Sequence, residues 1–449
     1  MNERQELLAS YVAAARQKMF DALDFLWKHP ETGFTEWESH RYLKEAWESL
    51  GYEVQEAGNI PGFYTDIDTG RPGPTLCIMA ELDALDIGNH PCSVDGKNHS
   101  CGHHAQGAAL LGVAAGLKGE HALDGLSGKI RLMMVPAEEA IQIPFREELR
   151  KNGIIRYYGG KQEFICRGLL DDVDLAIMVH TGNSLQTDFS CRASSNGFLI
   201  KSATFKGVSA HAAGASKGVN AEYAAFLALE ACNALRETFK DEDHVRFHPI
   251  VKGVNTAVNV IPDELMVETY VRTADARSMF FVNKRINRAL AGAAVSLGAR
   301  VMISDRPGYL PDDRYKPLME IAEKCCAELV GKERVLFNYK GHGSSSSDFG
   351  DVTSLMPGIQ YHAAGATGTS HGTDYYITNP ENACVNSAKS QVLVANELLK
   401  DDAAAAREIV SSYRPTFASK QEYVEFLDSM TMDCEAVTYE EDGSILIRV

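Results

Sequence analysis

The chain has 449 residues, more than one hydrophobic core usually organises, so two or more domains are expected. Its 44 Lys and Arg against 61 Asp and Glu give a formal net charge of −17, which argues against nucleic acid or an anionic membrane as a partner. We expect no membrane span because the chain has no long apolar run, and no secretory signal because no apolar segment directly follows its first residues. With only ten cysteines, we expect reduced thiols and a cytoplasmic location.

Helices and strands alternate in the first part of the chain. Residues 7–28 and 35–50 have the patterning of helices. Three short apolar segments follow, residues 75–79, 129–135 and 175–179, and each is typical of a buried strand. The alternation predicts an α/β fold with a largely parallel mixed sheet and helices on both faces.

Carboxylates or a histidine follow each of these three strands directly. Glu81 and Asp83 follow the first strand, Glu138 and Glu139 the second, and His180 ends the third. Ligands of open α/β sheets bind beyond the carboxyl ends of the strands, so these side chains are expected to converge on one site.

A cysteine and further histidines supply the other ligand types that a divalent transition metal prefers. They occur in the segment Cys101-Gly102-His103-His104 and at His371, which lies in a Gly-Thr-Ser-His-Gly loop. A second glutamate beside a ligand, as Glu138 stands beside Glu139, can accept the proton of a metal-activated water. The pattern predicts a metal-dependent hydrolase.

The order of elements changes near Ser195, where the patterns begin to predict a smaller α+β unit. Its strands are expected at residues 198–205, 245–251, 265–272 and 300–304, and its helices at 221–238 and 279–297. Helices at 315–330 and 380–400 and a strand at 444–449 are predicted after it. The expected organisation is a catalytic domain in two parts, 1–194 and 306–449, with an α+β lid, 195–305, inserted between them.

An ordered series of motifs extends from about residue 15 to about residue 400. The series consists of Glu81-Leu-Asp-Ala-Leu85, Cys101-Gly-His103, Pro136-Ala-Glu-Glu139, His180, Gly207-Val-Ser-Ala-His211-Ala, Asn259-Val-Ile-Pro262, Arg272, Ser347-Asp-Phe-Gly-Asp351 and His371. In kind and order it resembles the dinuclear-metal amidohydrolases of the aminoacylase and carboxypeptidase superfamily, particularly the branch with indole-acetyl-amino-acid hydrolases and p-aminobenzoyl-glutamate hydrolases.

The resemblance implies two divalent metal ions per chain. Zinc or manganese is expected, with cobalt or nickel as alternatives. The ligands that match the family by motif are Cys101, His103, Glu139, His180 and His371.

The resemblance also implies the roles of five further residues. Glu138 matches the general base, and Asp83 matches an acidic residue that orients a ligand imidazole. His211 matches a histidine that polarises the substrate carbonyl. Asn259 and Arg272 match groups that bind the substrate carboxylate, which a guanidinium can hold through two parallel hydrogen bonds.

The implied reaction is hydrolysis of an amide bond in an N-acyl or N-aroyl amino acid or a dipeptide-like substrate, a small molecule with a free carboxylate. The resemblance further implies a homodimer formed through the lid, residues 195–305. In such a dimer His211 often serves the site of the partner subunit.

The sequence departs from the family pattern at a few positions. Glu81 and His104 stand where the family usually has aspartate, and no proline follows His211. A polar insertion at residues 146–167 could shape the pocket. None of these changes removes a metal ligand.

Two other classes of function are alternatives. Cys101 could be the nucleophile of a thiol hydrolase with His103 as base, but two residues apart on a turn they are poorly placed for that proton transfer, and the glutamates would have no task. A non-catalytic or regulatory relative would be favoured if Glu138 or a ligand were missing, and none is. His362 is the alternative to His371 as the last ligand.

Overall fold

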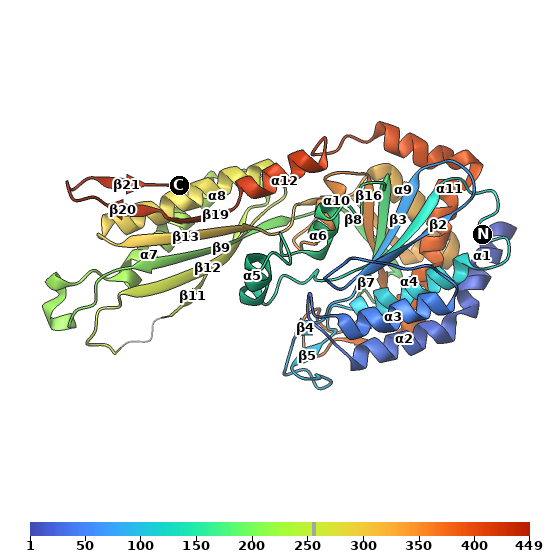
Figure 1. Ribbon diagram of the computed structural model, residues 1–449, viewed down its shortest axis with the longest axis horizontal. Coiled ribbons are helices and arrows are strands. Elements are labelled where there is room, and N and C mark those ends of the chain that lie inside the picture. Colours follow the sequence, from blue (N-terminus) through green and yellow to red (C-terminus); the bar gives the residue numbers. More distant parts are fainter. Residues whose placement is uncertain (254–256) are drawn as a thin grey trace. The chain divides into compact units, whose positions relative to one another are not determined.

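The computed structural model describes residues 1–253 and 257–449, and the chain forms two units that each contain a sheet (Figure 1). The first unit is Met1–Ser194, Asp313–His342 and Asp348–Lys420, and the second is Ser195–Asp312, Gly343–Ser347 and Gln421–Val449. The sequence patterns assigned all of 306–449 to the catalytic part. The structure instead places Gly343–Ser347 and Gln421–Val449 in the second unit, because the end of the chain adds a strand to that unit's sheet.

Four neighbouring parallel strands form the centre of the first sheet. In spatial order they are β6 (Lys129–Val135), β3 (Thr75–Glu81), β7 (Leu175–Gly182) and β16 (Gly358–Ala364). Outside them lie β1 (Gln55–Glu56) and β2 (Phe63–Asp68) on one side, and β8 (Phe189–Ser195), β14 (Asp312–Asp313) and β15 (Val335–Gly343) on the other. The pairs β2–β6 and β8–β16 are antiparallel, so the sheet is mixed.

Helices cover this sheet on both faces, which explains why all seven residues of β3 are buried. Helix α4 (His103–Leu117) packs on β3 and β7 among α1 (Glu3–Ala14), α2 (Arg16–Lys28), α3 (Trp37–Ser49), α9 (Lys316–Val330) and α11 (Ser387–Ser412). Helices α6 (Gly160–Cys166) and α10 (Phe349–Thr353) pack on β6 and β16 from the other face. The predicted α/β class, largely parallel mixed sheet and helices on both faces are confirmed.

Some elements differ from the sequence patterns. The predicted helix 7–28 is two helices that meet at Ala15, and the insertion 146–167 contains α6 and most of α5 (Ile143–Lys151). Two-residue strands β4 (Leu85–Asp86), β5 (Lys97–Asn98), β17 (Ala366–Thr367) and β18 (Tyr376–Ile377) form small ladders.

The second unit is an antiparallel sheet with two helices on it. Strands β10 (Arg246–Phe247) and β11 (Ile250–Lys252) pair with β12 (Glu264–Thr273), which is followed in spatial order by β9 (Gly197–Lys206), β13 (Arg300–Pro307) and β19 (Met432–Glu435). Helices α7 (Ala221–Ala234) and α8 (Ala276–Ser296) pack on the sheet. After α12 (Lys420–Ser429) and β19, the tail ends in the hairpin β20 (Val437–Tyr439) and β21 (Ile445–Ile447).

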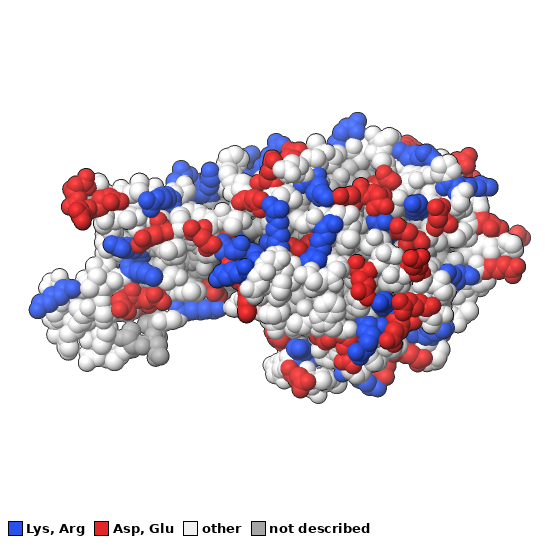
Figure 2. Space-filling view, in the orientation of Figure 1, with Lys and Arg blue, Asp and Glu red and all other residues white. Residues whose placement is uncertain are grey.

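Basic and acidic side chains are interspersed over the face of each unit shown in Figure 2. Within residues 1–253 and 257–449, no helix combines the length and apolar character that crossing a bilayer requires.

Candidate metal centre

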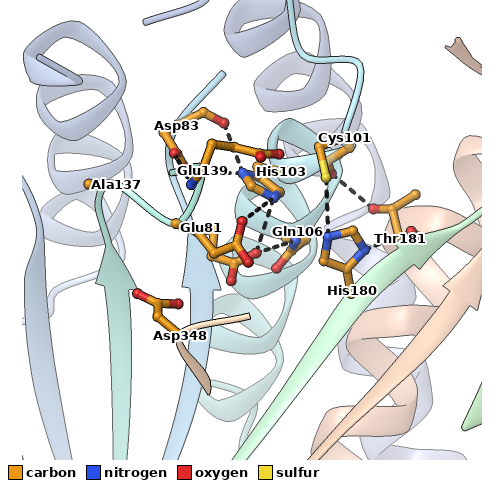
Figure 3. Close-up of polar contacts among 12 residues, drawn as sticks. Glu81, Asp83, Cys101, His103, Gln106, Ala137, Glu139, His180, Thr181 and Asp348 are labelled. Atoms are coloured by element: carbon orange, nitrogen blue, oxygen red, sulfur yellow. Dashed lines mark hydrogen bonds and ion pairs between the residues drawn. The ribbon is translucent and has the colours of Figure 1, made fainter. Parts of the chain in front are cut away.

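The carboxyl ends of β3, β6 and β7 bring the predicted polar side chains together (Figure 3). Glu81 is the last residue of β3, and the segment Pro136–Glu139 follows the last residue of β6. His180 belongs to β7, next to β3 in the sheet. The parallel arrangement therefore explains why residues far apart in sequence share one site.

A left-handed glycine positions Cys101 and His103. Gly102 has φ 91° and precedes α4 as its N-cap, and a Cβ there would overlap Tyr375 and Thr181. The Thr181 hydroxyl donates a hydrogen bond to the Gly102 carbonyl at 2.9 Å. A larger residue at position 102 would displace both neighbouring ligands.

The five predicted metal ligands form two groups that share Cys101. Cys101, His103 and His180 offer ligand atoms that all lie within 4.8 Å of one another, and the same holds for Cys101, Glu139 and His371. Sγ of Cys101 lies 3.5 Å from Nε2 of His180, and Nε2 of His371 lies 3.2 Å from Oε1 of Glu139. We call these groups the two thiolate triads.

Hydrogen bonds orient the ligand imidazoles so that Nε2 faces the centre. Nδ1 of His103 lies 3.0 Å from Oδ1 of Asp83, and Nδ1 of His180 lies 2.8 Å from the carbonyl of Thr181. Asp83 also accepts the backbone N–H of Glu139 at 2.8 Å. The buried Asp83, which is predicted to orient a ligand imidazole, thus contacts one member of each triad.

The donor set fits two divalent ions. Nε2 of His103 and Oε1 of Glu139 are buried and face other atoms of ligand type: Nε2 of His103 lies 3.3 Å from Oε2 of Glu81, and Oε1 of Glu139 lies 3.2 Å from Nε2 of His371. Sulfur, imidazole nitrogen and carboxylate oxygen are the ligand types of zinc and similar metals. Cys101, which belongs to both triads, would be a ligand available to either ion.

The metal-free centre holds protons that a metal would displace. Burial, reinforced by Glu139, raises the pKa of the Cys101 thiol well above its usual value. Burial would lower the pKa of His103, but Cys101 and Glu81 raise it well above normal. Both ligands must lose a proton to bind a metal.

We therefore expect metal affinity to rise with pH. The proton displaced from the Cys101 thiol, whose pKa burial raises, makes affinity increase about tenfold per pH unit below that pKa. Titration of metal-free protein against a chromophoric chelator between pH 6 and 8, corrected for the chelator's own protonation, measures this slope. An affinity that does not change with pH would contradict the displaced protons.

Glu138 lies beside the triads and is buried. Its Oε2 is 4.0 Å from Nε2 of His103. Burial first, then the nearby Glu81 and Glu139, raise its pKa well above the usual range. A carboxyl group with a raised pKa beside a metal centre is suited to accept and return a proton near neutral pH.

Residues that no sequence motif marked hold the Glu138–Glu139 segment in place. Ala137 has φ 58°, and its N–H donates to Oε1 of Glu36 at 2.8 Å. The buried Arg146, from the insertion, donates to the carbonyls of Tyr158 at 2.6 Å and of Glu139. No sequence pattern indicated this, because Glu36 is 101 positions from Ala137, and Arg146, although only seven positions from Glu139, lies in an insertion recognised only as polar.

His362, the alternative to His371, and His104, the neighbour of His103, lie outside the thiolate triads. His362 is on β16 with its ring centroid 5.5 Å from that of His180, and His104 packs against Trp27 at 5.0 Å between ring centroids. His371 has φ 63° and donates its backbone N–H to the carbonyl of Ser100 at 2.9 Å. The loop that carries His371 is thereby tied to the segment before Cys101.

His211, Asn259 and Arg272 belong to the second unit. His211 is exposed. The N–H of Ala212 donates to the carbonyl of Asn259 at 2.9 Å, so the segments that carry His211 and Asn259 lie side by side. Arg272, on β12, donates to the Ser346 hydroxyl at 2.7 Å and lies 5.1 Å from the centroid of the Phe198 ring.

Comparisons with known proteins agree with the motif series. Residues 77–397 match Peptidase family M20/M25/M40. The chain is 30% identical over 335 residues to the indole-3-acetyl-aspartic acid hydrolase of Enterobacter agglomerans, covering 71% of this chain and 70% of that protein. It is 29% identical over 305 residues to one of the subunits of the p-aminobenzoyl-glutamate hydrolase of Escherichia coli (strain K12), covering 66% of this chain and 59% of that relative.

Solved structures show the same fold. The Bacillus subtilis YXEP protein, described as a dinuclear metal binding peptidase from the M20 family, has a TM-score of 0.67 and 21% identity, covering 86% of this chain and 99% of that one. The Klebsiella pneumoniae aminobenzoyl-glutamate utilization protein has a TM-score of 0.64 and 19% identity, covering 87% of this chain and 98% of that one. The family match extends over more than half of the sequence, and the chain therefore belongs to Peptidase family M20/M25/M40 and is a hydrolase.

Proposed function

We propose that the protein hydrolyses the amide bond of an N-acyl or N-aroyl amino acid with two divalent ions bound in the thiolate triads. The observation that carries this proposal is the pair of triads sharing Cys101 with the buried Glu138 beside them. The related hydrolases, which act on indole-3-acetyl-aspartic acid and on p-aminobenzoyl-glutamate, support the substrate class. Zinc or manganese suits this donor set.

Glu138 is proposed to move the protons of the reaction. Two divalent ions in the triads would lower the pKa of a water molecule toward neutrality. Glu138 accepts the proton of that water and donates it to the nitrogen of the leaving amine. Protonating the nitrogen is necessary because an amide nitrogen is a poor leaving group.

His211, Asn259 and Arg272 are proposed to bind the substrate. The His211 imidazole donates a hydrogen bond to the oxygen on which negative charge develops, a contact commonly worth about 3 kcal/mol. Arg272 and Asn259 hold the free carboxylate. The hydroxyl of Ser346 restricts the guanidinium of Arg272, which reduces the entropy lost on binding.

We propose a homodimer formed through the second unit. Helix α7 exposes Tyr223, Phe226 and Leu227, with Tyr223 62% exposed. Strand β11 is fully exposed, and within residues 1–253 and 257–449 its ladder partner is β12, so its other edge is available for pairing with a second chain. An exposed strand edge beside an apolar helix face is a surface that a second copy can cover by extending the sheet.

A thiol hydrolase is disfavoured by the environment of Cys101. Burial raises the pKa of this thiol, whereas a thiol nucleophile needs a lowered pKa. A bound metal would remove the thiol proton, but the sulfur would then be bonded to the metal and could not act as the nucleophile.

The proposed function is tested by metal content and turnover together. Metal-reconstituted protein is incubated with a panel of N-acyl amino acids and dipeptides, and amine release is measured before and after EDTA. Cys101→Ala should lose metal by elemental analysis, while Cys325→Ala, a buried thiol outside the triads, should keep it. Turnover that survives EDTA would indicate thiol chemistry, and metal binding without turnover of any amide would indicate a non-catalytic relative.

Arg272→Ala is expected to raise KM for substrates with a free carboxylate by about 10- to 100-fold, since a charge-assisted hydrogen bond contributes about 1.5–3 kcal/mol. The same substrates with an amidated carboxylate should be affected much less, because they carry no charge for Arg272 to bind. Arg277→Ala, an exposed arginine on α8, is the matched control. Equal losses for acids and amides would remove Arg272 from carboxylate binding.

A further inference from the structure

Lys161 is a fully buried lysine enclosed by carboxylates. It lies in the first turn of α6, within the polar insertion. Its Nζ is 2.6 Å from Oε1 of Glu81 and 2.5 Å from Oδ1 of Asp348. Its backbone N–H also donates to Oδ2 of Asp348 at 2.9 Å. The ammonium thus has a fixed position between two acidic groups.

These carboxylates belong to a further cluster of metal-ligand type, besides the two thiolate triads and the group His103, Glu138 and Glu139. Glu81, Glu138 and Asp348 offer oxygens within 4.8 Å of one another, and all three are buried. We call this group the acidic triad. Oε2 of Glu81 accepts a hydrogen bond from Gln106 at 2.8 Å and lies 3.3 Å from Nε2 of His103. The acidic triad is therefore adjacent to the thiolate triads.

The acidic triad is short of positive charge even with the lysine present. The Nζ of Lys161 contacts one oxygen of Glu81 and one of Asp348, and all three acidic side chains of the triad are buried. One ammonium faces three carboxylates, so removing it would leave a buried, all-oxygen acidic pocket.

We propose that Lys161 is an internal cation that occupies the acidic triad and keeps divalent ions out of it. All-oxygen carboxylate groups bind manganese and magnesium, so this triad would compete for the same ions as the thiolate triads. Exclusion of an ion leaves the Glu138 carboxylate unligated and able to move protons. This last consequence rests on the proposed function, whereas the exclusion itself does not. Lys161 is thus a positioning residue that acts through Glu138.

The test compares the number of bound ions in Lys161 variants. Wild type, Lys161→Met and Lys161→Arg are stripped with a chelator, dialysed against Mn²⁺ and analysed for manganese per chain. Lys161→Met should bind one ion more than wild type, and Lys161→Arg, which keeps the positive charge, should match wild type. Lys161→Met should also lower kcat by about tenfold or more with little change in KM, because a ligated Glu138 is a poorer base.

Further variants separate exclusion from a merely structural role. Lys161→Gln keeps a polar side chain in case the methionine variant does not fold, and it should also gain an ion. The double variant Lys161→Met/Asp348→Asn removes one carboxylate with the lysine and should not gain one. If folded Lys161→Met or Lys161→Gln binds the same number of ions with the same affinity as wild type, the proposal is wrong. The measured quantity is the number of ions that a Lys161 variant gains over wild type. This difference can be read whatever number of ions wild type binds. A wild-type content other than two ions would count against the proposed function and not against the exclusion.

Discussion

Replacing Glu138 by glutamine is expected to lower kcat by about 10² or more while the protein keeps its fold and both metal ions, since removal of a general base typically costs that much. Glutamine has nearly the shape of glutamate but cannot accept the proton from water. Glutamine keeps a side-chain oxygen at position 138, next to His103 and Glu139, and the five predicted ligands are unchanged, so the metal content should not change. KM should change little, because the substrate is bound by other groups.

The measurement is steady-state turnover of metal-replete protein, with metal content determined on the same sample. Glu120→Gln, at a side chain that is 85% exposed, is the control for a change of charge alone. Glu139→Ala provides the contrast, because it removes a ligand and should lower the metal content itself. Wild-type turnover in metal-replete Glu138→Gln would take Glu138 out of the mechanism.

The strands that carry the centre were predictable because they are buried on both faces. Such strands consist of consecutive apolar residues, as in β3 and β6, and the polar residues directly after them mark their carboxyl ends. The rule that parallel strands present their ends at one edge then predicted convergence. Strand β2 alternates between buried and less buried residues, and β15 lies at the margin of the sheet and is mostly not buried. Both strands therefore lack this signal, and neither was predicted.

Lys161 and the tail show what the sequence pattern could not provide. Lys161 is 80 positions from Glu81 and 187 positions from Asp348, so no local periodicity reports their contact. The insertion was recognised only as polar, and a polar segment usually lies in solvent. Strand β19 pairs with β13 through a register that only the folded chain defines, and its residues do not form an apolar run.

The family pattern nevertheless marked position 81 as unusual. Glutamate is one methylene longer than the expected aspartate, and here its carboxylate meets both Gln106 and Lys161. The departure at position 81 and the buried lysine are therefore parts of one arrangement. This physical link was not visible until the structure brought the insertion against the end of β3.

Mixing two inactive variants is expected to restore activity if His211 serves the site of the partner subunit. His211 lies in the second unit and is exposed in the single chain, whereas Glu138 lies in the first unit. Glu138→Gln lacks the proposed base, and His211→Ala lacks the proposed oxyanion donor; loss of such a donor typically costs about 10²–10³ in kcat. In a heterodimer of the two, one site combines the intact Glu138 of one chain with the intact His211 of the other.

Random exchange of equal amounts makes half of the dimers heterodimers, so about a quarter of wild-type activity should return. Subunit exchange is verified with differently tagged chains, and oligomeric state is measured by light scattering. Glu138→Gln mixed with the Glu138→Gln/His211→Ala double variant is the control, because no pairing of those chains contains an intact base. Verified exchange without rescue, or a fully active monomer, would show that His211 acts within its own chain or takes no part in the reaction.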